Sequence, residues 1–105
     1  MRIILATLVV AALVAMSSLA LAHTPLFACY DNGDDTVTCE GGFSDGSSAA
    51  GVAVHIFDAD GNVLQDTALD EFSEITFDKP EGSYSVQFDA GEGHQIDVSG
   101  DDIVE

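Results

Sequence analysis

Gly51-Val52-Ala53-Val54-His55-Ile56-Phe57 is the stretch of sequence that decides the fold. Its even-numbered residues are apolar, and this alternation predicts a β-strand with one buried face. His55 has the opposite parity, so we expect it to point outward as an ordinary surface residue. The segment Asp58-Ala59-Asp60-Gly61-Asn62 that follows is typical of a hairpin turn.

Short segments of the same kind recur along the chain, separated by turns rich in Gly, Asp, Asn and Ser. No stretch after residue 22 keeps the apolar period of a helix. Six or seven strands at spacings of roughly ten residues predict an all-β fold, a small immunoglobulin-like or transthyretin-like β-sandwich. We expect residues 23–105 to form it as one domain. The other expected strands are 26–30, 36–39, 63–65, 74–77, 84–88 and 96–98.

The chain has two cysteines, Cys29 and Cys39. A hairpin centred on residue 34 would place them opposite each other, because their numbers sum to 68, as do those of Tyr30 and Thr38. Directly opposed residues on antiparallel strands approach to about 4.5–5.5 Å, within reach of a disulfide. We therefore expect a disulfide, which is typical of exported proteins and stabilises a small domain by about 2–4 kcal/mol.

Residues 1–22 have the three-part layout of a secretory signal peptide. Arg2 supplies the positive start, an apolar run extends over residues 3–16, and Ala20-Leu21-Ala22 offers a small-residue cleavage site. As a helix the run would be about 21 Å long, which is short of the ~30 Å hydrocarbon core of a bilayer. We expect removal of this leader, a periplasmic or secreted location, and no membrane span in the mature protein.

The charge balance is extreme, with 2 Lys+Arg against 19 Asp+Glu. Without the leader, Lys79 is the only strong base, and the net charge of the remaining 83 residues is −18. Such a polyanion excludes binding to nucleic-acid phosphates and to anionic lipid head groups. The expected partners are cations or positively charged surfaces, although acidity of this kind also suits a protein that stays soluble at high salt.

His23 is the first candidate metal ligand. Cleavage after Ala22 would make it the amino terminus, where its amine and its imidazole can chelate one metal ion. Copper and nickel favour such nitrogen ligands. Cleavage after Ala20 would instead place the histidine third, the position that builds a square-planar copper or nickel site. The alternative is that His23 merely follows a good cleavage site.

A family resemblance rests on the blocks Gly42-Phe43-Ser44-Asp45-Gly46-Ser47 and Gly51-Val52-Ala53-Val54 and on the ending Ala90-Gly91-Glu92-Gly93-His94. The first blocks are similar to carboxypeptidase-regulatory-like, or transthyretin-like, sandwiches. The ending resembles the periplasmic accessory proteins of energy-coupling-factor nickel and cobalt transporters. This resemblance implies a metal-uptake accessory module in which His94 is a ligand, with Glu92 beside it, and in which the partner is a membrane transporter permease.

The leading hypothesis is an exported, disulfide-linked sandwich that assists uptake of a divalent transition metal, nickel or cobalt, with copper as a further candidate. The expected ligands are His23 with its amine, His94 and a carboxylate such as Glu92. The alternative is a non-catalytic interaction or scaffold module without metal, and a copper carrier built on the terminal histidine is a third hypothesis. Residues 23–105 number 83 and leave little room for a substrate cleft, so we expect no enzymatic activity.

Overall fold

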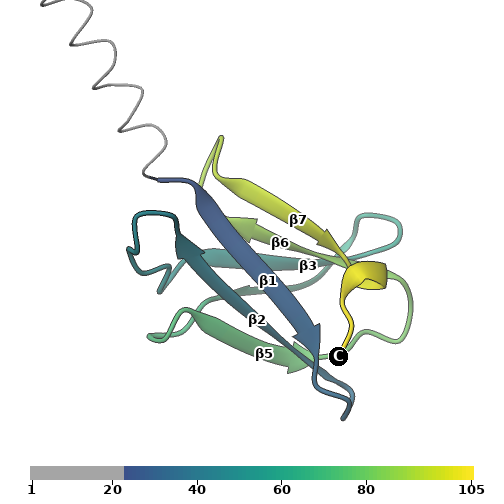
Figure 1. Cartoon of the computed structure of the whole chain (residues 1–105). Helices are drawn as coiled ribbons and strands as arrows, with labels where there is room; N and C mark the ends of the chain where they lie inside the picture. The colour runs from purple at the N-terminus through teal and green to yellow at the C-terminus, as the bar shows by residue number, and fades with distance from the viewer. Residues whose placement is uncertain (1–22) are drawn as a thin grey trace, which may run out of the picture.

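Seven antiparallel strands in two sheets form the protein (Figure 1). The structure, a computed structural model, describes residues 23–105, so the expected signal peptide, residues 1–22, lies outside the described residues. The small all-β sandwich predicted from the alternating segments is confirmed. The strands are β1 (Pro25–Asp31), β2 (Thr36–Phe43), β3 (Ala53–Asp58), β4 (Val63–Ala68), β5 (Glu74–Asp78), β6 (Tyr84–Asp89) and β7 (Gln95–Ser99), followed by the 3-10 turn η1 (Gly100–Asp102).

The strands divide into a three-stranded sheet, in the order β1-β2-β5, and a four-stranded sheet, in the order β4-β3-β6-β7. The chain crosses from one sheet to the other after β2, β4 and β5, as it does in immunoglobulin-like sandwiches. Figure 1 shows that β1 and β7, which belong to different sheets, start at the same end of the sandwich. In residues 23–105, no helix has the length and apolar character that crossing a membrane requires.

The core lies between the two sheets and is built by alternate residues of the central strands. In β3, Val54 and Ile56 are buried, as the parity of the sequence predicts. In β6, Tyr84, Val86 and Phe88 are buried in the same alternation. Because a one-residue slip would turn each of these side chains to solvent, the burial fixes the register of both strands.

At Gly41 in β2, side chains from beyond the three-stranded sheet pack directly against the backbone. A Cβ atom at this position would lie 2.6 Å from Leu69 Cδ1 and 2.9 Å from Phe88 Cε2. No side chain fits there without moving its neighbours, so glycine lets the three-stranded sheet pack against Phe88 of the other sheet. The rings of Phe27 and Phe43 flank Phe88 with centroid distances of 5.3 and 6.0 Å.

The predicted disulfide between Cys29 and Cys39 is confirmed. The two residues are directly opposed in the β1–β2 ladder, with Cα atoms 4.0 Å apart. Cys39 is fully buried, so the disulfide belongs to the core and joins the edge strand β1 to the central strand β2.

The largest differences from the expected strand boundaries lie in β2 and β4. The expected strands end at residues 39 and 65, whereas β2 and β4 continue to Phe43 and Ala68. Gly41 and Gly42 resemble a turn in the sequence, but both pair with β1, and at Gly41 the packing of Leu69 and Phe88 leaves no room for a side chain. In β4, five of the six residues are exposed and none is buried, so the strand lacks the apolar alternation on which the prediction depended.

Candidate functional site

The amino-terminal end of β1 lies beside the turn that follows β2. The antiparallel ladder from Pro25 and Phe43 continues for one more step, because Ser44 N donates to the Thr24 carbonyl at 2.9 Å and Thr24 N donates to Ser44 Oγ at 3.1 Å. This extension places His23 opposite Asp45. The Nδ1 atom of His23 lies 3.0 Å from Asp45 Oδ2.

Asp45 is held in position by its own turn. Its Oδ1 atom accepts hydrogen bonds from Ser47 Oγ at 2.6 Å and from Ser47 N at 2.9 Å, which leaves Oδ2 for His23. These hydrogen bonds, the side-chain one foremost, lower the pKa of the Asp45 carboxyl below its usual value. The carboxylate is thus ionised at neutral pH. The His23 side chain remains 63% exposed and open to a ligand from solvent.

The other two predicted ligands lie in the turn between β6 and β7. This turn is closed by hydrogen bonds from Ala90 N to the His94 carbonyl and from His94 N to the Gly91 carbonyl, and Gly91 and Gly93 have the positive φ angles of 107° and 80° that glycine tolerates. His94 Nδ1 donates to the backbone carbonyl of Glu92 at 3.3 Å. His94 and Glu92 are both exposed, and the Glu92 carboxylate has no role in this contact.

The structure brings His23 to Asp45, and it records no contact between His23 and either His94 or Glu92. Among residues 23–105, no three His, Cys, Asp or Glu side chains are grouped closely enough to hold a metal ion. The amino-terminal amine of His23 is not a side-chain donor, and it would exist only after cleavage of the leader. The predicted set of His23, His94 and Glu92 is therefore not assembled by these side chains alone and stays a prediction.

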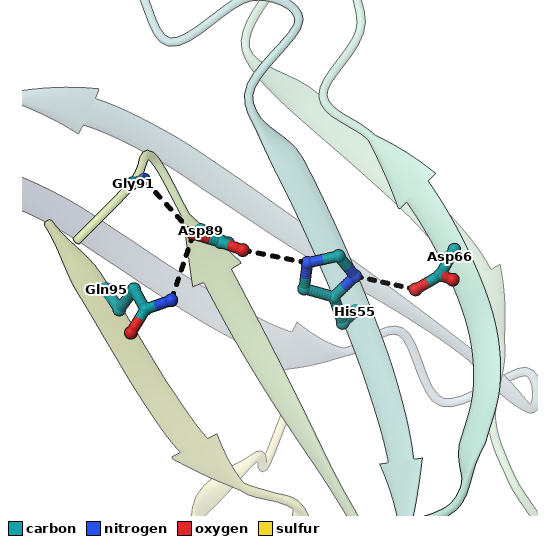
Figure 2. Close-up of polar contacts among 5 residues, drawn as sticks. All are labelled: His55, Asp66, Asp89, Gly91 and Gln95. Atoms are coloured by element: carbon teal, nitrogen blue, oxygen red, sulfur yellow. Dashed lines mark hydrogen bonds and ion pairs between the residues drawn. The ribbon is translucent and has the colours of Figure 1, made fainter.

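His55 is the third histidine, and it lies on the outer face of the four-stranded sheet (Figure 2). Its Nδ1 atom donates to Asp66 Oδ1 at 2.6 Å, and its Nε2 atom donates to Asp89 Oδ2 at 3.0 Å. An imidazole that donates from both nitrogens is protonated. The three residues come from β3, β4 and β6, and we call them the histidine clamp.

Asp89 is positioned by further hydrogen bonds. Its Oδ1 atom accepts from Gly91 N and from Gln95 Nε2, both at 3.1 Å (Figure 2). The hydrogen bond from Gln95, followed by those from His55 and Gly91, lowers the pKa of Asp89. The bond to Asp66, followed by the bond to Asp89, raises the pKa of His55 above its usual 6.5, although partial burial opposes the shift. Because both ring nitrogens are engaged, His55 offers no free lone pair to a metal in this state.

Sequence reasoning missed Asp45, Asp66 and Asp89 as partners of the histidines. The signal for Asp45 was present, because 23 and 45 also sum to 68, the rule that paired the cysteines. Comparison with family models, with curated proteins and with solved structures finds no match, so the candidate sites rest on the geometry of this chain.

Proposed function

We propose that the chain is an exported accessory protein that captures a divalent transition metal, nickel or cobalt, at an amino-terminal His23 and passes it to a membrane transporter permease. The observation that carries the proposal is the His23–Asp45 pair at the start of the sandwich. The disulfide supports an oxidising compartment outside the cytosol, where removal of residues 1–22 would free the His23 amine.

The donors suit a transition metal. Removal of the leader after Ala22 would add the amine to the imidazole of His23, and the two nitrogens of one residue chelate a single ion. Donors at about 2.0–2.2 Å from a metal and at right angles to each other are about 3 Å apart. The distance of 3.0 Å between His23 Nδ1 and Asp45 Oδ2 is compatible with such a pair after loss of the Nδ1 proton.

Two properties of the surroundings favour cation capture. Asp45 is ionised and fixed by Ser47, so little ordering is required when a metal binds. The nineteen acidic residues raise the local concentration of cations and the rate of encounter. This field does not select a metal, so selectivity would come from the nitrogen donors.

In this proposal, His94 and Glu92 either complete the coordination of the metal at His23 or bind the metal during its transfer to the permease. Their turn joins β6 to β7, and β7 starts at the same end of the sandwich as β1 (Figure 1). Within residues 23–105, the exposed His94 imidazole bonds only to the Glu92 carbonyl, through Nδ1, so its Nε2 atom is available for coordination.

The test starts from the full chain expressed with its leader, and mass spectrometry identifies the amino terminus of the exported product. We expect cleavage after Ala22. Isothermal titration with nickel, cobalt and copper should then give one site with a Kd below about 0.1 mM, a binding free energy of about 5.5 kcal/mol. Acetylation of the terminal amine should weaken binding at least about tenfold, because it removes one nitrogen of the chelate.

Asp45→Asn measures the contribution of the Asp45 carboxylate and should weaken metal binding several-fold. Asp58→Asn is the matched control, because Asp58 also caps its own turn through Asp60 N and Asn62 N but has no histidine partner in the described part of the chain. Comparable losses in both variants would assign the effect to general negative charge. Failure of all three metals to bind, or binding that acetylation leaves unchanged, would contradict the proposal and favour the interaction module without metal.

A further inference from the structure

We infer that the free edge of β4, with the hollow beside it, binds an extended segment of a partner protein in which basic and apolar residues alternate. This surface is made by other residues than the His23–Asp45 site, so the inference stands independently of metal binding. Three features of the described residues carry it: an unpaired strand edge, an apolar hollow with an acidic rim, and the distribution of charge.

The strand edge is the first feature. β4 pairs only with β3, so along its other side the backbone groups of alternate residues have no strand partner within residues 23–105. Proteins commonly protect such an edge with charged residues, proline, a β-bulge or a covering segment. β4 has a bulge at Leu64, but its first two residues, Val63 and Leu64, are apolar and are 53% and 50% exposed. An edge of this kind accepts an added strand from a partner.

The hollow is the second feature. It has a volume of about 480 Å³ and lies between the first half of β4 and the loop of residues 79–83 that joins β5 to β6. Its apolar lining comes from Ile56, Leu64 and Pro80. Its charged residues are the acidic Asp58, Asp78 and Glu81 and the basic Lys79. A lysine or arginine side chain fits such a surface, because its stem packs on apolar atoms while its charge meets carboxylates.

The charge distribution is the third feature, and it selects the occupant. Lys79 is the only lysine or arginine in residues 23–105, and its Nζ atom lies 2.8 Å from Asp31 Oδ2. Lys79 also lines the hollow, but its ion pair is with Asp31 outside the lining, and no ion pair within residues 23–105 joins it to Asp58, Asp78 or Glu81. A second copy would bring another eighteen net negative charges to the contact, which disfavours self-pairing. A basic, apolar segment complements both the edge and the rim.

The probe is a six-residue peptide, the length of β4, in which lysine and valine alternate. Titration of the isotopically labelled exported protein should shift the amide resonances of residues 63–68 and 78–83. A diastereomer in which every valine is the D enantiomer has the same composition and charge but cannot form a regular strand. We expect it to bind at least about threefold more weakly, because it loses the ladder hydrogen bonds.

Two pairs of variants localise the contact. Leu64→Ser should weaken peptide binding about threefold or more, whereas Leu26→Ser, an equally exposed leucine on β1, should not. Glu81→Gln should weaken binding more than Glu71→Gln, whose residue is exposed in another turn. Equal affinity for both diastereomers, amide shifts spread over all acidic turns, or equal effects within a pair would reduce the interaction to charge attraction and overturn the inference.

Discussion

In each sheet of this sandwich, side chains link neighbouring strands, and the two sheets use different chemistry for these links. In the three-stranded sheet, the Cys29–Cys39 disulfide joins β1 to β2 inside the core. In the four-stranded sheet, His55 on β3 bonds to Asp66 on β4 and to Asp89 on β6, on the outer face (Figure 2). The first connection is covalent and responds to reducing agents, whereas the second is ionic and responds to protons.

This contrast follows from where each connection lies. The disulfide needs no water and no charge, so it tolerates full burial at Cys39. A protonated imidazole between two carboxylates would be costly to bury, and it lies instead on a face that stays partly hydrated, with the His55 side chain 24% exposed. One sheet is therefore fixed under oxidising conditions, while the other can be loosened by a change of pH.

Loss of the disulfide should give the largest effect on stability. Reduction by dithiothreitol should lower the free energy of unfolding by about 2–4 kcal/mol, because the unfolded chain regains the freedom that the cross-link removes. Urea unfolding with and without reductant measures the difference. The double variant Cys29→Ala, Cys39→Ala is the control, and reductant should not affect it. A change below about 1 kcal/mol would mean that the ladder alone fixes β1 to β2.

Substitution of Gly41 should come next, because it disturbs the contact between the two sheets. Gly41→Ala places a methyl group against Leu69 and Phe88 and should destabilise the fold by about 1–3 kcal/mol in the same urea experiment. Gly42→Ala is the matched control, since a Cβ atom at this neighbouring glycine meets nothing within 4 Å. Equal losses in the two variants would show that the strand tolerates neither methyl group for local reasons.

The histidine clamp should give a smaller, pH-dependent effect. The pKa of His55 is raised above 6.5 in the folded state, so its stabilisation is complete below pH 6.5 and is lost as pH rises through the folded-state pKa. We expect His55→Gln to lower the free energy of unfolding by a few tenths to about 1 kcal/mol below pH 6.5. The loss should be smaller once the pH exceeds the folded-state pKa of His55. Unfolding free energies of both proteins across this pH range measure the difference.

Asp89 sets the acid limit of the same clamp. Its folded-state pKa is lowered from 3.8, so its contribution is present above pH 3.8 and is lost as pH falls through the folded value. The advantage of the natural protein over His55→Gln should thus be greatest in the mildly acidic range. A difference that stays constant with pH would mean that His55 acts by packing, for example against the nearby Phe57 ring, rather than by charge.

The sequence was sufficient for the fold because alternation and hairpin symmetry are local properties. Val54 and Ile56 indicated the buried face of β3, and the symmetric numbering of Cys29 and Cys39 predicted their pairing. β4 was assigned too short, because an edge strand with almost no buried residue has no alternation to detect.

The partners of His55 required information that local patterns do not contain. Asp66 is opposed to His55 only when the β3–β4 bulge between Ile56 and Phe57 sets the register. Asp89 lies on β6, and it reaches His55 diagonally, past Gln87, once β3 and β6 pair. Asp45, in contrast, was accessible through the symmetry of the β1–β2 hairpin, because the ladder continues one step beyond β1.

The scarcity of basic residues has a consequence for detecting the protein. Trypsin cleaves after lysine and arginine, and residues 23–105 contain only Lys79, which is followed by Pro80, a residue that blocks this cleavage. The ion pair with Asp31 further restrains the same side chain. A tryptic digest would therefore leave this domain as one large acidic fragment. Detection by mass spectrometry should use an enzyme that cleaves at aspartate or glutamate, which are abundant in its exposed turns.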